Sequence, residues 1–392
     1  MASILAPTPF VRATVTNFFF FLSLNGFVLL PLYIQQLGGT EIEIGLVMGI
    51  YSGVGILCQP LIGPWVDVIG RRPFMLVGIG LNLAAALLAV APGGVPLLAV
   101  VRALQGIGFS LFFVASFSYV VDLIPPAERG WALGIYGIAG FVSTAVAPLV
   151  GEWVIRTAGF RALFLLSAAL ALIPAALVWP LPETPRSTGL PARLAPGAAR
   201  AAVVDVLHRH MLVTMFFGLG SGVIFAFLPT FAEDLGVTTL SLFYTAYALS
   251  AIVVRLAGGR LIDTRGRRAV IVPSMFVQAA ATGLLALLGV LVTRSSAVPV
   301  LPGLFVAGLL SGGAHGFLYP GLAALVTDAT PPERRASVVG VFSAMFLVGQ
   351  TAGAFAFGYV ANALGYGSMW AALTALLLLG GLVSLRLAAP AR

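Results

Sequence analysis

The sequence contains no lysine, a single cysteine and few charges of either sign, and each shortage argues against a class of function. Cys58, as the only cysteine, cannot form an internal disulfide, and no cluster of Cys and His has metal-ligand spacing. No glycine-rich phosphate loop is present for a nucleotide-driven pump, and no nucleophile–base set is present for catalysis. We therefore expect a protein that is not an enzyme and that holds no cofactor.

The chain has instead an excess of apolar residues. They make up 60% of the 392 residues, whereas soluble domains have about 45–50%. The apolar residues fall into stretches of about 20 residues, which is the length of a membrane-spanning helix. Twelve such stretches are predicted, at residues 12–36, 42–65, 73–91, 95–120, 131–155, 160–181, 210–235, 239–262, 270–292, 299–327, 337–363 and 368–388. The predicted fold class is an all-α membrane protein.

A long internal repeat divides the twelve predicted helices into two halves. The segment 63–72 returns as 259–268, at a shift of 196 residues, and later landmarks such as Gly159 and Gly365 repeat at a shift of 206. Two homologous membrane halves are typical of transporters. We expect six-helix bundles at 1–181 and 210–392, related by pseudo-symmetry and joined by a linker at 182–209. The ten-residue difference between the shifts predicts one insertion, which is expected in the loop 293–303.

The distribution of arginine predicts the orientation of the chain in the membrane. Sixteen of the arginines that lie outside the spans fall on one side, whereas Arg156, Arg161 and Arg294 fall on the other. By the positive-inside rule, both termini are expected in the cytoplasm. The net charge of +8 is thus a topology signal, and we expect no nucleic-acid partner.

The repeated segment places charges where the second and eighth spans end. Asp67 is followed four residues later by Arg71, within reach of its carboxylate, and Gly70 between them allows a tight turn. Asp122 closes the fourth span on the same side of the membrane, so an Asp–Arg–Asp cluster is predicted at the membrane edge. Gly63 lacks a side chain, and another helix is expected to approach closely there. The same arrangement is predicted in the second half.

This pattern, Gly-x-x-x-Asp-x-x-Gly-Arg-Arg, resembles the loop 2–3 signature of the major facilitator superfamily, which returns at loop 8–9 in that family. The resemblance implies alternating access, with the cluster latching the cytoplasmic side in the outward-open state. Val68 and Thr264 stand where the family usually has Arg. The alternative is that the arginines serve only the positive-inside rule. We call these residues the gating motif: Gly63, Asp67, Gly70, Arg71, Arg72 and Asp122, with Gly259, Asp263, Gly266, Arg267, Arg268 and Asp328.

Arg102 is a charge inside the fourth span. Its segment, with Gln105 and Gly106 following, resembles the fourth-helix signature of proton-coupled members of the same family. The repeat places Gly308 at the equivalent position, so the charge belongs to one half only. Such a buried charge is typical of a functional pathway. The alternative is a side chain that snorkels to the interface.

The fifth span resembles the antiporter signature Gly-Pro-x-x-Gly-Gly at Pro148 and Gly151, although Ala147 and Glu152 replace two of its glycines. Glu152 is a candidate proton carrier, and a helix end that faces water is its alternative. Gly106, Pro148, Gly151 and Gly353 are expected to let their helices bend.

The remaining pathway candidates are polar residues within predicted spans. Arg255 is eight residues before Asp263, and we expect it either to face the pathway or to pair with an aspartate. His315 has a pKa range that suits contact with a proton or a polar substrate, and its alternative is a hydrogen bond within a helix interface. Tyr319 and Asn25 are weaker candidates.

Together these features predict a secondary transporter in a bacterial-type inner membrane, acting as a monomer on a small molecule, with the lipid bilayer as its surroundings. Within that class we expect proton-coupled efflux of a drug-like compound or metabolite, similar to bacterial drug and arabinose-type efflux permeases. The proton is then the coupling ion. Symport or facilitated uptake of a sugar or organic anion is the alternative, and a membrane receptor or enzyme is a third class.

Overall fold

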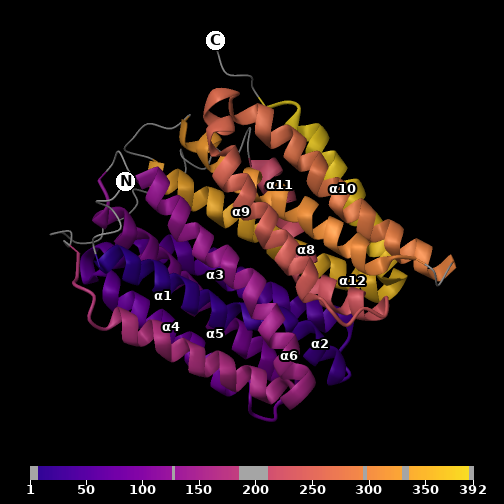
Figure 1. The fold of residues 1–392 in the computed structure, drawn as a ribbon, viewed down its shortest axis with the longest axis horizontal. Coiled ribbons are helices and arrows are strands. Elements are labelled where there is room, and N and C mark those ends of the chain that lie inside the picture. Colours follow the sequence, from indigo (N-terminus) through magenta and orange to yellow (C-terminus); the bar gives the residue numbers. More distant parts are fainter. Residues whose placement is uncertain (1–7, 126–128, 185–210, 295–297, 329–334, 388–392) are drawn as a thin grey trace. The chain divides into compact units, whose positions relative to one another are not determined.

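The computed structural model of the protein describes residues 8–125, 129–184, 211–294, 298–328 and 335–387 (Figure 1). Within these ranges the chain forms helices and turns. The helices are α1 (Thr8–Asn25), η1 (Gly26–Leu29), α2 (Leu30–Gln36), α3 (Glu41–Ile69), α4 (Arg71–Leu88), α5 (Gly94–Leu123), α6 (Arg129–Val178), α8 (Met211–Asp234), α9 (Ser241–Thr264), α10 (Arg267–Arg294), α11 (Val300–Asp328) and α12 (Arg335–Ser384). Most of the predicted linker at 182–209 lies outside the described residues.

Nine helical stretches of the described chain are long and apolar enough to cross a membrane. Two of these stretches each contain two helices, because α6 leaves helical geometry at Gly159 (φ 79°) and α12 does so at Gly365 (φ 76°). The apolar part of α9, Ser241–Ala257, is shorter than the others. Counted in this way, the helices correspond to the twelve predicted spans, and the all-α membrane fold is confirmed.

The backbone repeats as the sequence does. Gly38 after α2 and Gly236 after α8 both have positive φ, near 80° and 75°. The next residue in each case, Gly39 or Val237, donates its N–H to the carbonyl five residues earlier, at 2.9 and 2.8 Å. This is the Schellman ending of a helix, which needs a left-handed residue that glycine supplies at little cost. Both halves therefore end their first span with the same turn.

The ten-residue insertion lies in a helix and not in the loop where the sequence predicted it. α4 has 18 residues, whereas its repeat counterpart α10 has 28. The segments that follow them, 89–93 and 295–299, are equal in length. The inserted sequence is apolar and helix-forming, so it extends α10 without adding to the connection. The expectation of an insertion at 293–303 was therefore wrong.

The chain divides into two compact units. The first unit contains Met1–Leu30 and Gly53–Arg193, and the second contains Pro31–Ser52 and Leu194–Arg392. The early part of α3 belongs to the second unit because it packs against α12. Thr351 of α12 donates a hydrogen bond to the hydroxyl oxygen of Ser52 at 3.0 Å.

Glycines form the contact between α8 and α12, which lie side by side in the second unit (Figure 1). Gly218 and Gly222 on α8 face backbone carbonyls of α12, and Gly349 and Gly353 on α12 face backbone carbonyls of α8. A Cβ on Gly353 would lie 2.7 Å from the carbonyl oxygen of Leu219. Small residues spaced four apart allow this close approach of helices in a membrane.

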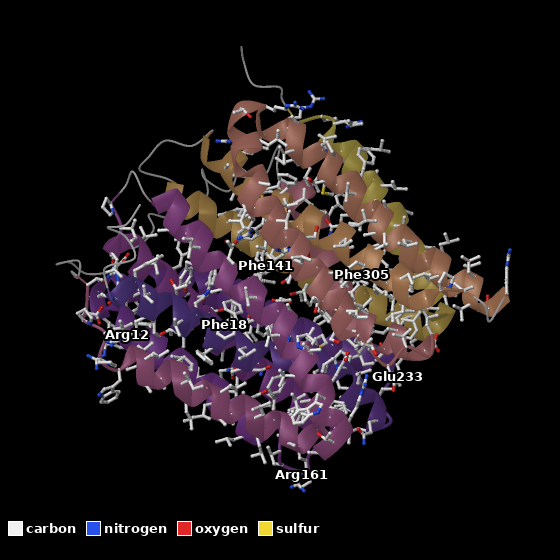
Figure 2. All side chains as sticks on the ribbon, in the orientation of Figure 1. Arg12, Phe18, Phe141, Arg161, Glu233 and Phe305 are labelled. Atoms are coloured by element: carbon white, nitrogen blue, oxygen red, sulfur yellow. The ribbon has the colours of Figure 1, made fainter. Side chains whose placement is uncertain are left out.

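The outward faces of the helices carry apolar side chains, as a lipid environment requires (Figure 2). Large apolar side chains that are more than half exposed include Leu57, Leu61, Trp65, Trp153, Leu256 and Leu364. Charged residues such as Arg161 and Glu233, labelled in Figure 2, lie near the ends of helical segments.

Candidate functional site

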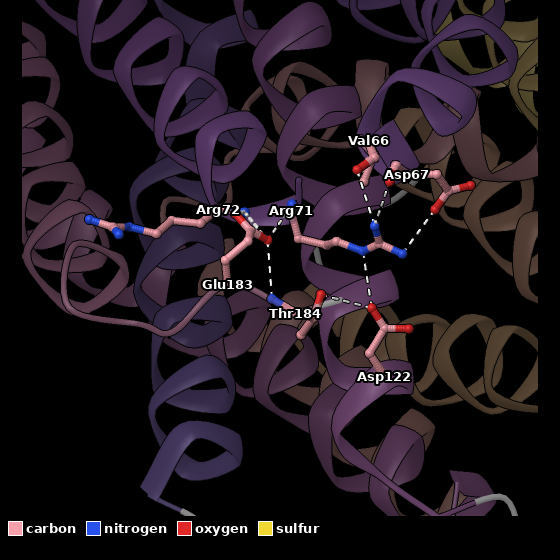
Figure 3. Close-up of polar contacts among 7 residues, drawn as sticks. All are labelled: Val66, Asp67, Arg71, Arg72, Asp122, Glu183 and Thr184. Carbon is pink, nitrogen blue, oxygen red and sulfur yellow. Dashed lines mark hydrogen bonds and ion pairs between the residues drawn. The ribbon is translucent and has the colours of Figure 1, made fainter. Parts of the chain in front are cut away.

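The first copy of the gating motif forms the predicted cluster around Arg71 (Figure 3). Gly70, with φ 116°, turns the chain between α3 and α4, so that Arg71 begins α4 directly beside the last turn of α3. Its terminal nitrogen lies 2.9 Å from Oδ1 of Asp67, and its Nε lies 3.0 Å from Oδ2 of Asp122 at the end of α5. The predicted Asp–Arg–Asp contact is therefore present in the first unit.

The same guanidinium group also satisfies backbone groups. Its other terminal nitrogen donates to the carbonyls of Val66 and Asp67 at 3.2 and 3.3 Å. The last carbonyls of a helix have no partner within the helix. Arg71 is only 7% exposed and the Asp122 side chain 28%, so this ion pair is partly shielded from water and stronger than a surface pair, whereas the Asp67 side chain is 56% exposed. One side chain thus joins the ends of α3, α4 and α5.

Glu183 and Thr184 complete this cluster, and sequence reasoning missed both. Oε1 of Glu183 accepts the backbone N–H of Arg71 at 2.8 Å, and Oε2 accepts that of Arg72 at 3.3 Å. The hydroxyl of Thr184 donates to Oδ2 of Asp122 at 2.9 Å. A carboxylate at a helix N-terminus is favoured by the helix dipole. Both residues closely follow the sixth predicted span and lie on the same side of the membrane as the motif. That position is the one feature of the sequence that could have suggested their contact with the cluster.

Arg72 extends away from the cluster and lies over an aromatic ring. The carbon of its guanidinium group is 5.6 Å from the centre of the Trp179 ring, just after α6. This is within the range of a cation–π interaction. Arg71 therefore contacts α3 and α5, whereas Arg72 contacts the residue that follows α6.

The second copy of the motif has the same turn. Gly266 has φ 84°, α10 begins at Arg267, and Gly259 lies within α9. Arg268 donates to the backbone carbonyl of Leu385, just after α12, at 2.7 Å. The side chains of Asp263 and Asp328 lie outside the described part of the structure, so the second Asp–Arg–Asp cluster stays a prediction.

The expected close approach at Gly63 is not met among the described residues. A Cβ built on Gly63 would have no atom within 4 Å. The glycines that bring helices together are others, such as Gly78 and Gly108, each of which faces a backbone carbonyl of the other's helix. The spacing within the motif therefore did not identify where backbones meet.

Arg102 and Gln105 form a buried pair on α5. The guanidinium group donates to Oε1 of Gln105 at 2.9 Å, and the two residues are 7% and 0% exposed. Gly106, one residue later, is also buried. The charge is therefore held within the first unit and not turned out toward solvent, which argues against the snorkelling alternative.

Glu152 is buried near the periplasmic end predicted for its span. It is 9% exposed and lies 3.8 Å from Arg156, whose side chain is half exposed. Burial argues against the alternative of a helix end that faces water. α6 passes through Pro148 and Gly151 with helical geometry, and α12 does so through Gly353. Bending at these positions stays a prediction.

His315 lies within an aromatic cluster of the second unit. Its ring centre is 5.0 Å from that of Phe217 on α8, 5.7 Å from that of Tyr247 on α9, and 6.3 Å from that of Tyr319, with which it is stacked. Arg255 lies within electrostatic reach of His315 and of both tyrosines. The structure thus brings together three of the predicted pathway residues, namely Arg255, His315 and Tyr319.

Asn25 belongs to a separate polar contact in the first unit. Its amide nitrogen donates to the hydroxyl oxygens of Ser143 and Thr144 on α6, each at 3.1 Å. This contact joins the end of α1 to α6.

Comparison with known proteins agrees with the fold. A family profile described as Major Facilitator Superfamily matches residues 13–298 and 210–392. The multi-drug resistance efflux pump PmrA of Streptococcus pneumoniae is 23% identical over 352 residues, covering 86% of this chain and 85% of the relative. The staphylopine export protein of Staphylococcus aureus is 22% identical over 376 residues, covering 92% and 91%.

Solved structures share the same fold. The nucleoside transporter NupG matches with a TM-score of 0.77 and 16% identity, over 97% of this chain and 99% of the other. The human organic anion transporter MFSD10 matches with a TM-score of 0.69 and 21% identity, over 96% and 99%. Because the family profile spans almost the whole chain, the chain belongs to the Major Facilitator Superfamily and is a secondary transporter.

Proposed function

We propose that this transporter exports a small amphipathic compound, such as a drug or a metabolite, in exchange for protons. The observation that carries the coupling is the burial of Arg102 against Gln105 in one half only. A charge held inside a membrane protein is costly, and such residues are usually retained for a pathway. The efflux pump of S. pneumoniae and the export protein of S. aureus support the outward direction.

The gating motif is proposed to act as the cytoplasmic latch. Arg71 links the ends of three helices through Asp67, Asp122 and backbone carbonyls. Helices joined in this way move together, so the first unit keeps one rigid cytoplasmic edge when the two halves rock. The second copy has the same proposed role, through Arg267, Arg268 and its two aspartates.

The aromatic cluster around His315 is proposed as part of the substrate pathway. Arg255 supplies positive charge there, His315 supplies a ring nitrogen for hydrogen bonding, and Tyr319 supplies a ring and a hydroxyl. Aromatic side chains of this kind bind amphipathic ligands through their faces and polar tips. These groups favour an anionic or neutral substrate over a cation. Asn25 and Glu152 are the proposed contributors from the first half, with Glu152 as the proton carrier.

Transport is tested with purified protein in liposomes that hold a pH-sensitive dye. Cationic, anionic and sugar-like compounds are added under an imposed proton gradient. We expect proton movement that depends on substrate and runs opposite to it. Movement of proton and substrate in the same direction would indicate symport and would contradict the proposed exchange. Solute flux without proton movement would show that the protein is a facilitator and would contradict the coupling role of Arg102 and Glu152.

The role of Arg102 is tested by Arg102→Gln in the same assay. We expect proton movement driven by substrate to fall to the level of protein-free liposomes, because the neutral side chain removes the buried charge. Arg294→Gln, at the exposed end of α10, is the matched control and should behave as the wild type. Wild-type proton movement in Arg102→Gln would refute the assignment.

We propose that the protein works as a monomer in a bacterial-type inner membrane. Each half carries its own copy of the gating motif, so a single chain holds both. Light scattering of the protein in detergent measures this directly. A mass corresponding to two chains, with transport lost on dilution to monomers, would contradict it.

A further inference from the structure

The two units differ at one place where the repeat predicts that they should agree. In the first unit, Arg72 lies over Trp179, and Glu183 accepts the N–H groups that begin α4. The repeat makes Arg268 the counterpart of Arg72 and Leu385 the counterpart of Trp179. Arg268 contacts Leu385 through its backbone carbonyl at 2.7 Å, so the second unit has the same arginine at the same helix end.

Four substitutions change the charge or the aromatic ring at this place. Ile69 of the first half is Arg265 in the second, so a cation is added. Trp179 is Leu385, so the aromatic ring over the arginine is lost. Glu183 corresponds in sequence to Ala389, which lies outside the described residues and whose methyl side chain cannot supply a carboxylate. Pro180 corresponds to Arg386, which adds a second cation, so the second half has two more positive charges and one negative charge fewer at this place.

A shallow, largely open hollow, which we call the cavity, occupies this place in the second unit. Its volume is about 400 Å³, and it is lined by Arg265, Arg268, Ala269, Val272, Pro273 and Leu385. None of these six residues is acidic, and two carry guanidinium groups. Arg268 uses one N–H on Leu385, and a guanidinium group has five N–H donors. Two guanidinium groups in a lining that contains no carboxylate attract an anion.

The cavity changes from charged to apolar along α10. Val272 lies one turn beyond Arg268, and Pro273 lies one turn beyond Ala269, about 6 Å deeper along the helix axis. Leu385, which is 45% exposed, forms the opposite wall after the end of α12. An occupant with a charged end at the arginines and an apolar part on Val272, Pro273 and Leu385 fits this lining.

We propose that this cavity binds the headgroup of an anionic phospholipid. The phosphate lies on Arg265 and Arg268, and supplies the negative charge that Glu183 supplies in the first unit. The glycerol and the first acyl carbons lie on the apolar wall. Arginine binds phosphate oxygens in pairs, with directed hydrogen bonds that lysine does not provide. Basic pockets between membrane helices at the bilayer surface are suited to such headgroups. This site is separate from the proposed transport pathway.

The proposal is tested by native mass spectrometry of the full-length protein in detergent. Phosphatidylglycerol with oleoyl chains is titrated, and the apparent Kd of the first bound lipid is measured for each variant. We expect Arg265→Gln to weaken binding about fivefold, and Arg265→Gln with Arg268→Gln to weaken it about thirtyfold. Arg294→Gln, at the other end of α10, is the matched control and should bind as the wild type does.

Two further measurements separate this site from its alternatives. Phosphatidylcholine with the same chains should fail to compete, and inorganic phosphate at millimolar concentration should displace little of the bound phosphatidylglycerol. Arg265→Gln leaves the Arg268–Leu385 hydrogen bond in place, so its fold should be intact by gel filtration and by melting temperature. Unchanged binding in the double variant, or an equal loss in Arg294→Gln, would overturn the proposal. Full displacement by inorganic phosphate would also overturn it, in favour of a free-anion site.

Discussion

At the scale of single residues, Arg71 shows why the identity of a cation matters. Its guanidinium group contacts two carboxylates and two carbonyls from three directions, which a planar fork of five donors can do. A lysine ammonium group carries the same charge but is a compact point of charge on a flexible stem. The cluster therefore depends on geometry as well as on charge.

Arg71→Lys should uncouple the helix ends while it conserves the charge. We expect a loss of about 1–3 kcal/mol of stability, because buried acceptors lose their partners, and slower transport in the liposome assay. Arg161→Lys, at an exposed position, is the control and should leave both quantities unchanged. An Arg71→Lys variant with wild-type melting temperature and transport would mean that charge alone suffices.

Glu183→Gln tests the contact that links α4 to the residues after α6. The amide oxygen can still accept one N–H, but the negative charge at the helix N-terminus is lost. We expect destabilisation by roughly 1 kcal/mol, measured as a lower melting temperature in detergent. Glu233→Gln, at the exposed end of α8, is the matched control. Equal melting temperatures for the two variants would remove Glu183 from the cluster.

The sequence predicted the contacts of Arg71 with Asp67 and Asp122 but not the contact with Glu183. Asp67 and Arg71 are four residues apart, and the repeat marks Asp122 as equivalent to Asp328, so their meeting could be inferred. Glu183 is 112 residues from Arg71, and no spacing rule connects two residues that only the tertiary fold brings together. Its position at the end of a predicted span gave the side of the membrane but not the contact.

At the scale of helices, the glycines of α8 and α12 determine how closely these helices pack. A Cβ on Gly222 would collide with the backbone carbonyl of Gln350, and backbone cannot move aside as a flexible side chain can. Gly80 on α4 is also helical, yet a Cβ there would meet no described atom within 4 Å. Both positions are helical glycines, but Gly222 faces a neighbouring backbone whereas Gly80 has open space around it.

Gly222→Ala and Gly80→Ala should therefore change stability in opposite directions. Gly222→Ala is expected to destabilise by about 1–3 kcal/mol, because the helices must separate to admit the methyl group. Gly80→Ala is expected to stabilise by about 0.5–1 kcal/mol, because alanine loses less backbone entropy in a helix. Melting temperatures of the two variants in the same detergent measure this. A similar change in both melting temperatures would show that helix propensity, and not packing, determines the effect of the substitution.

The helices also show where sequence patterns are insufficient. Apolar runs predicted the spans well, because length and hydropathy are properties of the segment alone. The extension of α10 was assigned to a loop, because an apolar, helix-forming insertion has the same composition as the helix that it extends. Gly353 packs against Leu219, and the expected bending of α12 there stays a prediction. A glycine in a sequence does not show whether its missing side chain serves flexibility or contact.

At the scale of the whole molecule, the backbone repeats more faithfully than the charges do. Both halves have the Schellman turn after the first span, the glycine turn before the third, and the glycine break between the last two. Arg102, Arg265 and Glu183 each occur in one half only, opposite Gly308, Ile69 and Ala389. The shared turns preserve the fold, and the unshared charges are where the two halves acquire separate roles.

The orientation of the chain is the prediction that belongs to this largest scale. α10 has 28 residues and is about 42 Å long at 1.5 Å per residue, which exceeds a hydrocarbon core of about 30 Å. Its two ends therefore lie on opposite sides of the membrane. Arginines resist translocation, so the side with sixteen of them should be the cytoplasm.

Variants with a single introduced cysteine can report this orientation. Cys58 is the only native cysteine, so Cys58→Ala removes background labelling. In that variant, Arg294→Cys and Arg161→Cys should react with an impermeant thiol reagent added outside intact cells. Arg386→Cys should react only after the membrane is opened, because the residue after α12 is expected in the cytoplasm. The reverse labelling would invert the topology, and the gating motif would then lie on the outer face, where it could not be a cytoplasmic latch. Labelling of all three from outside would contradict the three crossings expected between Arg294 and Arg386, namely α11 and the two helices of α12, and would leave the arginine asymmetry without a physical cause.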